Sequence, residues 1–192
     1  MVFNGLPKPT SSNSLLTSQA YSQKVLSERN QLEQFLRFHL VPDTTLLLPV
    51  SQLTEVLSIP LGQIVPIPQM PPWVMGVYNW RGEILWMVDL GALLGLTPHA
   101  RQTQVTPIYR AIVLQSVADS STVAKVHRQL LGVVVSRVED IEWCNPSEIQ
   151  SPTGASVTAN LAPFLRGYWL QPQGDMLMVL DGESILAAMP KP

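Results

Sequence analysis

The chain has 192 residues and a mass of 21.2 kDa, and 46% of its residues are hydrophobic, which is enough to fill the core of one domain or of two small ones. Only 14% of the residues are charged and the net charge is −2, so the sequence has no basic stripe for phosphate groups, and we do not expect nucleic acid as the main partner. Because charged residues are few, part of the surface must be apolar, and we expect this apolar surface to contact partner proteins.

The sequence favours a cytoplasmic protein that does not insert into a membrane. No apolar stretch approaches the ~18–20 residues that span a bilayer. The single cysteine, Cys144, has no second thiol for an internal disulfide. Residues 1–14 lack the cationic start and apolar stretch of a secretion signal.

Residues 1–33 are expected to form an N-terminal extension, and residues 34–192 the folded remainder. Up to about residue 21 the chain is rich in Ser, Thr, Asn and Pro, and such a composition buries too little apolar surface to offset the entropy of ordering. Within residues 22–33, Val25 and Leu32 share one face of a predicted short helix.

The rest of the chain is expected to consist of short strands, because its 17 prolines are spread throughout and interrupt both helices and long strands. Residues 144–163 are expected to be a loop, since they contain several Pro and Gly and little periodicity. Alternating or β-branched patterns predict strands at 36–40, 46–50, 108–115, 130–138, 164–170 and 176–180.

Residues 74–89 are predicted to form a hairpin around a tight turn at Arg81-Gly82. Both faces of this hairpin are apolar, so it either lies within a barrel-like core or offers one face to a partner. After the hairpin, Asp89 is expected to cap a short helix that ends at Gly95, and Asp181 begins a similar segment over 181–189.

The sequence contains a weak internal repeat. Residues 50–56 are similar to 135–141, and residues 82–89 are similar to 174–181, in the same order and with nearly constant spacing. Two copies of one small β module would leave such a pattern. We therefore expect an all-β fold of two small β barrels that share or abut one core, formed roughly by the first and the second half of residues 34–192.

Catalytic and metal sites find little support. His39, His99 and His127 lie far apart in the sequence, so we expect no metal, and we expect no cofactor because the common nucleotide-binding and nucleophile motifs are absent. Asp89 and Glu83 are candidates for an acid/base pair, but a helix cap explains Asp89 and a solvated turn explains Glu83. A small hydrolytic or ligand-binding β protein remains the less favoured alternative.

Trp80 and Arg81 stand out among the aromatic and charged residues, because they are neighbours at the tip of the predicted hairpin. Tryptophan and arginine contribute large contact areas and directional bonds when a partner excludes water from them. This tip is therefore a candidate protein-binding site, while core packing is the expected role of most other tryptophans.

Several segments together resemble the CheW family, the coupling proteins of bacterial chemosensory arrays. The resemblance runs from about Gln34 to Met189, and its sharpest motif is Gly-Val-x-Asn-x-Arg-Gly at residues 76–82. It implies two SH3-like β barrels around a shared core and no catalytic activity. It also implies an adaptor that links the cytoplasmic tips of chemoreceptors to the regulatory domain of a CheA-type histidine kinase. The segments that carry the resemblance are 35–38, 76–85, 88–90, 131–135 and 176–181.

The resemblance also implies partner-binding residues. Two positions depart from the family pattern: Trp80 stands where Leu or Val is usual, and Gly91 stands where Arg is usual. Such changes alter an interface more than a fold. The alternative is therefore an adaptor of a variant pathway, such as pilus-based twitching or phototaxis. The partner-binding residues expected are Leu53, Glu55, Val56, Asn79, Trp80, Arg81, Gly82 and Gly132.

Overall fold

A computed structural model describes residues 32–41, 43–60, 62–99, 107–116, 129–152, 157–171 and 173–189. Glu33 and all the described residues after it belong to one compact unit. The helix predicted within residues 22–33 falls almost entirely outside the described residues. No helix within these described ranges is long and apolar enough to cross a membrane.

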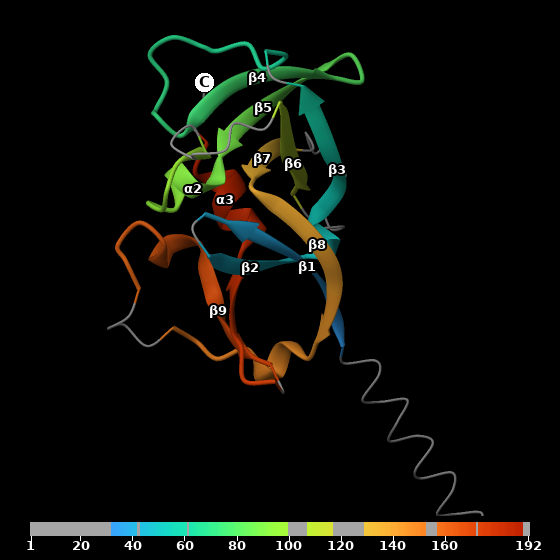
Figure 1. The fold of residues 1–192 in the computed structure, drawn as a ribbon, viewed down its shortest axis with the longest axis vertical. Coiled ribbons are helices and arrows are strands. Elements are labelled where there is room, and N and C mark those ends of the chain that lie inside the picture. The colour runs from blue at the N-terminus through green and yellow to red at the C-terminus, as the bar shows by residue number, and fades with distance from the viewer. Residues whose placement is uncertain are drawn as a thin grey trace, which may run out of the picture. The chain divides into compact units, whose positions relative to one another are not determined.

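The described residues form an all-β fold of two five-stranded sheets with short helices, as predicted (Figure 1). The first sheet has the strand order β8-β1-β2-β10-β9, and the second has the order β3-β6-β7-β5-β4. The strands are β1 (Glu33–Leu40), β2 (Thr44–Pro49), β3 (Leu53–Pro60), β4 (Val74–Trp80), β5 (Glu83–Asp89), β6 (Ile108–Gln115), β7 (Leu130–Val135), β8 (Arg137–Cys144), β9 (Leu165–Leu170) and β10 (Met176–Leu180). The helical turns are η1 (Val50–Gln52), α2 (Leu90–Leu93), η3 (Pro146–Glu148), η4 (Ala162–Phe164) and α3 (Gly182–Ala187).

The two sheets correspond strand by strand, which confirms the internal repeat. The segments that resemble each other lie in β3 and β8, the first strands of the two orders, and in β5 and β10, the fourth strands. In both sheets the fourth strand runs parallel to the third, β5 beside β7 and β10 beside β2, whereas the other neighbours are antiparallel.

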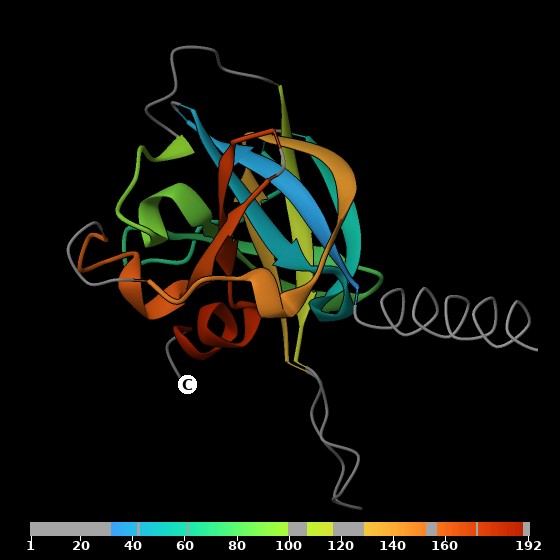
Figure 2. The same ribbon diagram turned by 90° about the horizontal axis from the view of Figure 1, so that it is seen from below.

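The internal repeat predicts one module in each half of the chain. The two sheets do not follow this division. The second sheet uses the continuous run β3 to β7, whereas the first combines β1 and β2 with β8, β9 and β10 from the other end of the chain. Figures 1 and 2 show this mixture as blue strands lying beside orange and red ones. The second sheet is thus formed by one continuous segment. The first sheet begins before this segment and is completed by strands that follow it.

Apolar side chains form a large cluster shared by both sheets and a smaller cluster within each sheet. The hairpin β4–β5 contributes to two of them. Leu85 and Met87 are buried in the cluster of the second sheet, while Trp86 and Val88 pack in the shared cluster. The hairpin therefore packs on both faces, and its exposed residues lie at the tip and directly beside it.

The edge strands β3 and β8 are where the structure departs from the predicted elements. No strand was predicted at Leu53–Pro60, and the single strand predicted over 130–138 is broken at Ser136, where β7 ends and β8 begins. In β3 the burial alternates regularly, but the polar Glu55 is half-buried and the apolar Val56 is exposed, so the apolar and polar residues do not alternate with it. The pairing of each edge strand also has a register shift, between Leu53 and Glu55 in β3 and between Val138 and Ile141 in β8.

The predicted helix starts and the predicted stop are confirmed. Asp89 accepts a hydrogen bond from the backbone N–H of Ala92 at 3.1 Å, and Asp181 accepts one from the backbone N–H of Glu183 at 3.1 Å. Gly95 follows α2 with φ +72°, a left-handed conformation that glycine adopts at low cost. Both modules thus run from their fourth strand directly into a helix capped by an aspartate.

Candidate partner-binding site

The tip of the β4–β5 hairpin is a two-residue turn in which both central residues have left-handed backbone. Trp80 pairs with Glu83 across the turn, and Arg81 and Gly82 have φ of +56° and +85°. Such a turn matches the twist of the two strands but is unfavourable for a residue with a side chain. The side-chain oxygen of Asn79 supports it by accepting the backbone N–H of Gly82 at 3.0 Å.

Glu55 on β3 holds the two large residues of this tip. One carboxylate oxygen of Glu55 accepts the indole N–H of Trp80, and the other lies 2.9 Å from an Arg81 guanidinium nitrogen. The guanidinium also lies over the Trp80 ring, 4.9 Å from its centroid, within the range of a cation–π contact. Glu55 is partly buried, whereas 67% of the Arg81 side chain is exposed, so the cation is held in place and still presented to solvent.

The structure thus brings together Glu55 with Asn79, Trp80, Arg81 and Gly82, and we call these five residues the tip cluster. Glu55 and Trp80 come from the two edge strands of the second sheet, which therefore approach each other at this point. The sequence motif predicted the turn residues, but no spacing rule indicated that Glu55, some 26 residues earlier in the chain, bonds to them.

The remaining predicted site residues lie outside the tip cluster. Leu53 is half-buried and packs against the shared apolar cluster, whereas Val56 is 44% exposed on β3. Gly132 is buried in β7, where an added Cβ would lie 2.4 Å from Met87 Sδ. The missing Cβ of Gly132 thus leaves room for the Met87 side chain, and its part in partner binding stays a prediction.

Ile84 is a surface residue whose exposure was not predicted from the sequence. It pairs with Asn79 immediately beyond the turn and is 75% exposed. Ile84 and Trp86 are two residues apart on β5, so they share a face, and Trp86 packs in the shared cluster. Val56 pairs with Ile112 of β6, which belongs to the same cluster. Ile84 and Val56 therefore project on one face of the second sheet, and the apolar pattern on both faces of the hairpin was the available signal.

The candidate acid/base pair is not assembled for catalysis. The two carboxylate oxygens of Asp89 accept backbone N–H groups of Ala92 and His99, at 3.1 and 2.6 Å. Glu83 lies exposed beside the turn at the other end of the same strand. In the part of the chain that the structure describes, no group of three His, Cys, Asp or Glu residues lies close enough to hold a metal ion.

Comparison with known proteins identifies the family. The family model of the CheW-like domain matches residues 34–189. The chain belongs to the CheW-like domain family. This finding confirms the resemblance carried by the Asn-x-Arg-Gly motif, whose residues form the hairpin tip described above.

Two named relatives and one solved structure agree with this membership. "Chemotaxis protein CheW" of Rhizobium meliloti is 30% identical over 120 residues, 62% of this CheW-like chain and 67% of the relative. "Probable chemotaxis protein CheW" of Rhizobium etli is 33% identical over 101 residues, 53% of this chain and 56% of the relative, so only just over half of that protein's length is matched. The scaffolding protein TtCheW of Thermoanaerobacter tengcongensis shares the fold, with a TM-score of 0.60 and 19% identity over 78% of this chain and 88% of that one.

Proposed function

We propose that this chain is a non-catalytic adaptor of a chemotaxis-type signalling array. It links the cytoplasmic tip of a chemoreceptor to the regulatory domain of a CheA-type histidine kinase, and it works in the cytoplasm. Membership of the CheW-like domain family and the chemotaxis names of its relatives support this proposal.

The observation that carries the proposal furthest is the way Glu55 fixes Arg81 while leaving it exposed. A flexible arginine loses side-chain entropy when a partner immobilises it, whereas an arginine already held loses less. The Trp80 ring and the Glu55 carboxylate orient the guanidinium before any partner arrives. Arg81 is therefore presented as a preorganised anchor for an acidic or carbonyl-rich surface.

Apolar residues beside the tip cluster complete a surface suited to protein contact. Val56 and Ile84 project from the same face of the second sheet, and neither packs into an apolar cluster of the described fold. An apolar area beside a directional charged anchor is the composition of a binding hot spot. In this proposal, the tip cluster with Val56 and Ile84 is the contact surface for one of the two partners.

The proposal is tested in an array reconstituted from receptor tips, a CheA-type kinase and this chain. We expect wild-type protein to bind both partners and to bring the kinase under receptor control. Arg81→Glu should weaken binding at least tenfold, a loss of about 1.4 kcal/mol, because it reverses the charge of the anchor. Arg166→Glu is the matched control, since Arg166 is a partly exposed arginine on the first sheet. Absence of binding to either partner by the wild-type chain would contradict the proposal.

Exchanging the charges of Glu55 and Arg81 tests whether Arg81 contacts the partner or only stabilises the hairpin tip. The double variant Glu55→Arg with Arg81→Glu keeps two opposite charges at the tip but presents the wrong sign to the partner. If Arg81 contacts the partner, the double variant stays as weak as Arg81→Glu. Full recovery of binding would instead mean that the ion pair serves only the shape of the hairpin.

A further inference from the structure

Two large apolar residues are exposed on β8, on the other sheet from the tip cluster. Ile141 is 48% exposed and Trp143 is 56% exposed, and neither belongs to any of the three apolar clusters. They alternate along the strand, so both project from the same face of the first sheet. An exposed tryptophan beside an exposed isoleucine leaves apolar area in water that a binding partner would cover.

The backbone of β8 is also open on one side. β8 is the last strand of its sheet order and pairs with β1 only. The corresponding outer strands at the opposite ends of the two orders are covered. Val65 exchanges two backbone hydrogen bonds with Val77 of β4, and Gln150 exchanges two with Tyr168 of β9. Within the described ranges, no such backbone bridge covers the outer side of β8.

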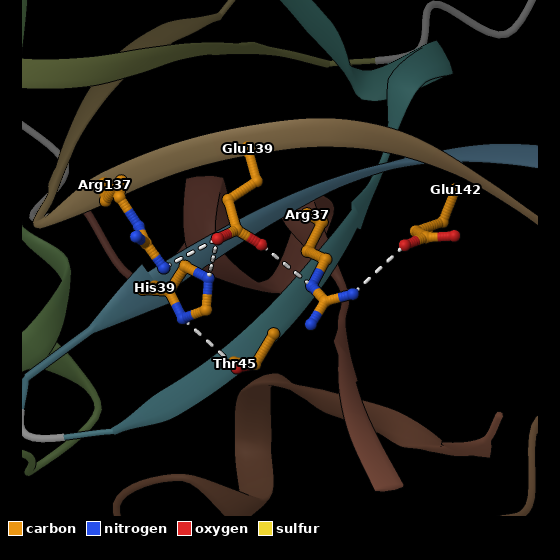
Figure 3. Close-up of polar contacts among 6 residues, drawn as sticks. All are labelled: Arg37, His39, Thr45, Arg137, Glu139 and Glu142. Atoms are coloured by element: carbon orange, nitrogen blue, oxygen red, sulfur yellow. Dashed lines mark hydrogen bonds and ion pairs between the residues drawn. The ribbon is translucent and has the colours of Figure 1, made fainter. Parts of the chain in front are cut away.

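The first half of β8 is occupied by an ion cluster centred on Glu139 (Figure 3). The Glu139 carboxylate lies 3.0 Å from Arg37, 2.9 Å from His39 and 2.6 Å from Arg137. Arg37 also pairs with Glu142 at 3.2 Å, and the register shift opposite β1 lies in the same stretch. Bulges and charges of this kind protect an edge strand from further pairing.

The second half of β8, residues 141–144, has no register shift, and its only residue in the ion cluster is Glu142. Its alternation places Ile141 and Trp143 on one face and Glu142 towards the other, and the exposed Asp140 directly precedes this segment. Glu142 is paired with Arg37, whereas exposed Asp140 makes no ion pair with any other described residue. The open edge thus offers an apolar face and, beside it, the exposed carboxylate of Asp140 to a strand that pairs with it.

We propose that the outer edge of residues 141–144 binds an extended segment of a partner protein in which apolar residues alternate with lysine or arginine. The segment adds a strand to the first sheet through backbone hydrogen bonds, places its apolar side chains over Ile141 and Trp143, and brings a cation to Asp140. This docking edge goes beyond the proposed adaptor function, because it lies on the other sheet and uses none of the residues of the tip cluster.

The test uses the full chain and three synthetic eight-residue peptides. The first alternates Val with Lys, the second alternates Val with Glu, and the third repeats the first with every other valine replaced by proline, which removes backbone donors. The chain is labelled with 5-fluorotryptophan, and the Trp143 signal among its five tryptophans is identified with Trp143→Phe. We expect the Val-Lys peptide alone to shift the Trp143 fluorine resonance and to slow hydrogen exchange in β8.

Variants locate the binding. Trp143→Lys and Ile141→Lys should each lower the affinity for the Val-Lys peptide about tenfold or more, measured by fluorescence anisotropy. Leu170→Lys is the matched control, an exposed leucine on β9 at the opposite end of the same sheet, and should leave the affinity unchanged. Circular dichroism checks that each variant is folded.

Four results would overturn the docking edge. Equal binding of the Val-Glu peptide would remove the charge preference, and equal binding of the proline peptide would remove the strand pairing. Unchanged affinity in folded Trp143→Lys would place the peptide elsewhere. Dimerisation of the unliganded chain, abolished by Trp143→Lys in sedimentation experiments, would show that a second copy of this chain occupies the edge.

Discussion

Trp80 donates its indole N–H to the carboxylate of Glu55, joining the hairpin β4–β5 to β3 at the place where Arg81 is presented to solvent. The same carboxylate therefore serves two donors with different roles. One donor belongs to a half-buried ring that packs against the cluster of the second sheet, and the other to an exposed cation. The packing of Trp80 is thus coupled through Glu55 to the position of Arg81.

Trp80→Phe should destabilise the fold by about 2 kcal/mol, because the smaller phenyl ring loses part of the indole's packing and the hydrogen bond to a charged acceptor. The free energy of unfolding in urea measures this change. Trp143→Phe is the matched control, since Trp143 is mostly exposed and packs in no cluster, and it should change the free energy by less than about 0.5 kcal/mol. Equal losses in the two variants would mean that the indole N–H of Trp80 contributes nothing to stability.

The sequence was sufficient to predict the duplicated all-β fold, because the repeat preserves features that have local causes. The aspartates at positions 89 and 181 cap helices at the ends of equivalent strands, and a glycine-containing turn precedes each of those strands. It was insufficient to place the two modules along the chain. The pairing of β2 with β10 joins segments more than 130 residues apart, and no local pattern encodes such a contact.

In the tip cluster, too, the contacts between sequence neighbours were predictable and the contact with a distant residue was not. Arg81, Gly82 and Asn79 are neighbours in sequence, so the turn that they form was predictable from their types. Glu55 joins them only because the second sheet curves until its edge strands approach each other. The packing of Gly132 also depends on a distant residue, since the side chain of Met87 on the neighbouring strand β5 occupies the space that a Cβ would need.

Acidification should weaken the fold through Glu139. The imidazole of His39 against the carboxylate, together with the charges of Arg137 and Arg37, holds the pKa of Glu139 below its usual value, although desolvation acts in the opposite direction. A carboxylate with a lowered pKa stabilises the folded state above its unfolded pKa, and this contribution is lost as the pH falls through the folded value. Unfolding free energies measured in urea from about pH 6 to about pH 3 should fall less steeply in Glu139→Gln than in wild type.

Asp140→Asn is the control for this pH profile, because Asp140 is the exposed neighbour of Glu139 on the same strand and has no ion pair among the described residues. Its profile should follow that of the wild type. Identical slopes for Glu139→Gln and wild type would contradict a stabilising role for the ion cluster on β8.

Gly76→Ala should be one of the most damaging single-methyl changes in the chain. Gly76 has φ +137°, and an added Cβ would lie 2.1 Å from the backbone oxygen of Val65. Because this neighbour is backbone and takes part in the Val65–Val77 bridge, relief requires the bridge to move. We expect a loss of about 3 kcal/mol or more. Gly174→Ala, at φ +99° with open space around it, should cost only about 1 kcal/mol.

Cys144 should be unreactive in the folded protein. Burial, with a further contribution from the charge of Glu148, raises the pKa of its thiol to about 12. At pH 8 only about one thiol in ten thousand would then be the reactive thiolate. Because the chain has one cysteine, a colorimetric thiol assay reports this site alone. We expect negligible reaction in buffer and one equivalent in denaturant. Rapid modification of the folded chain would show that the apolar cluster around Phe35 and Trp169 opens often enough to expose the thiol.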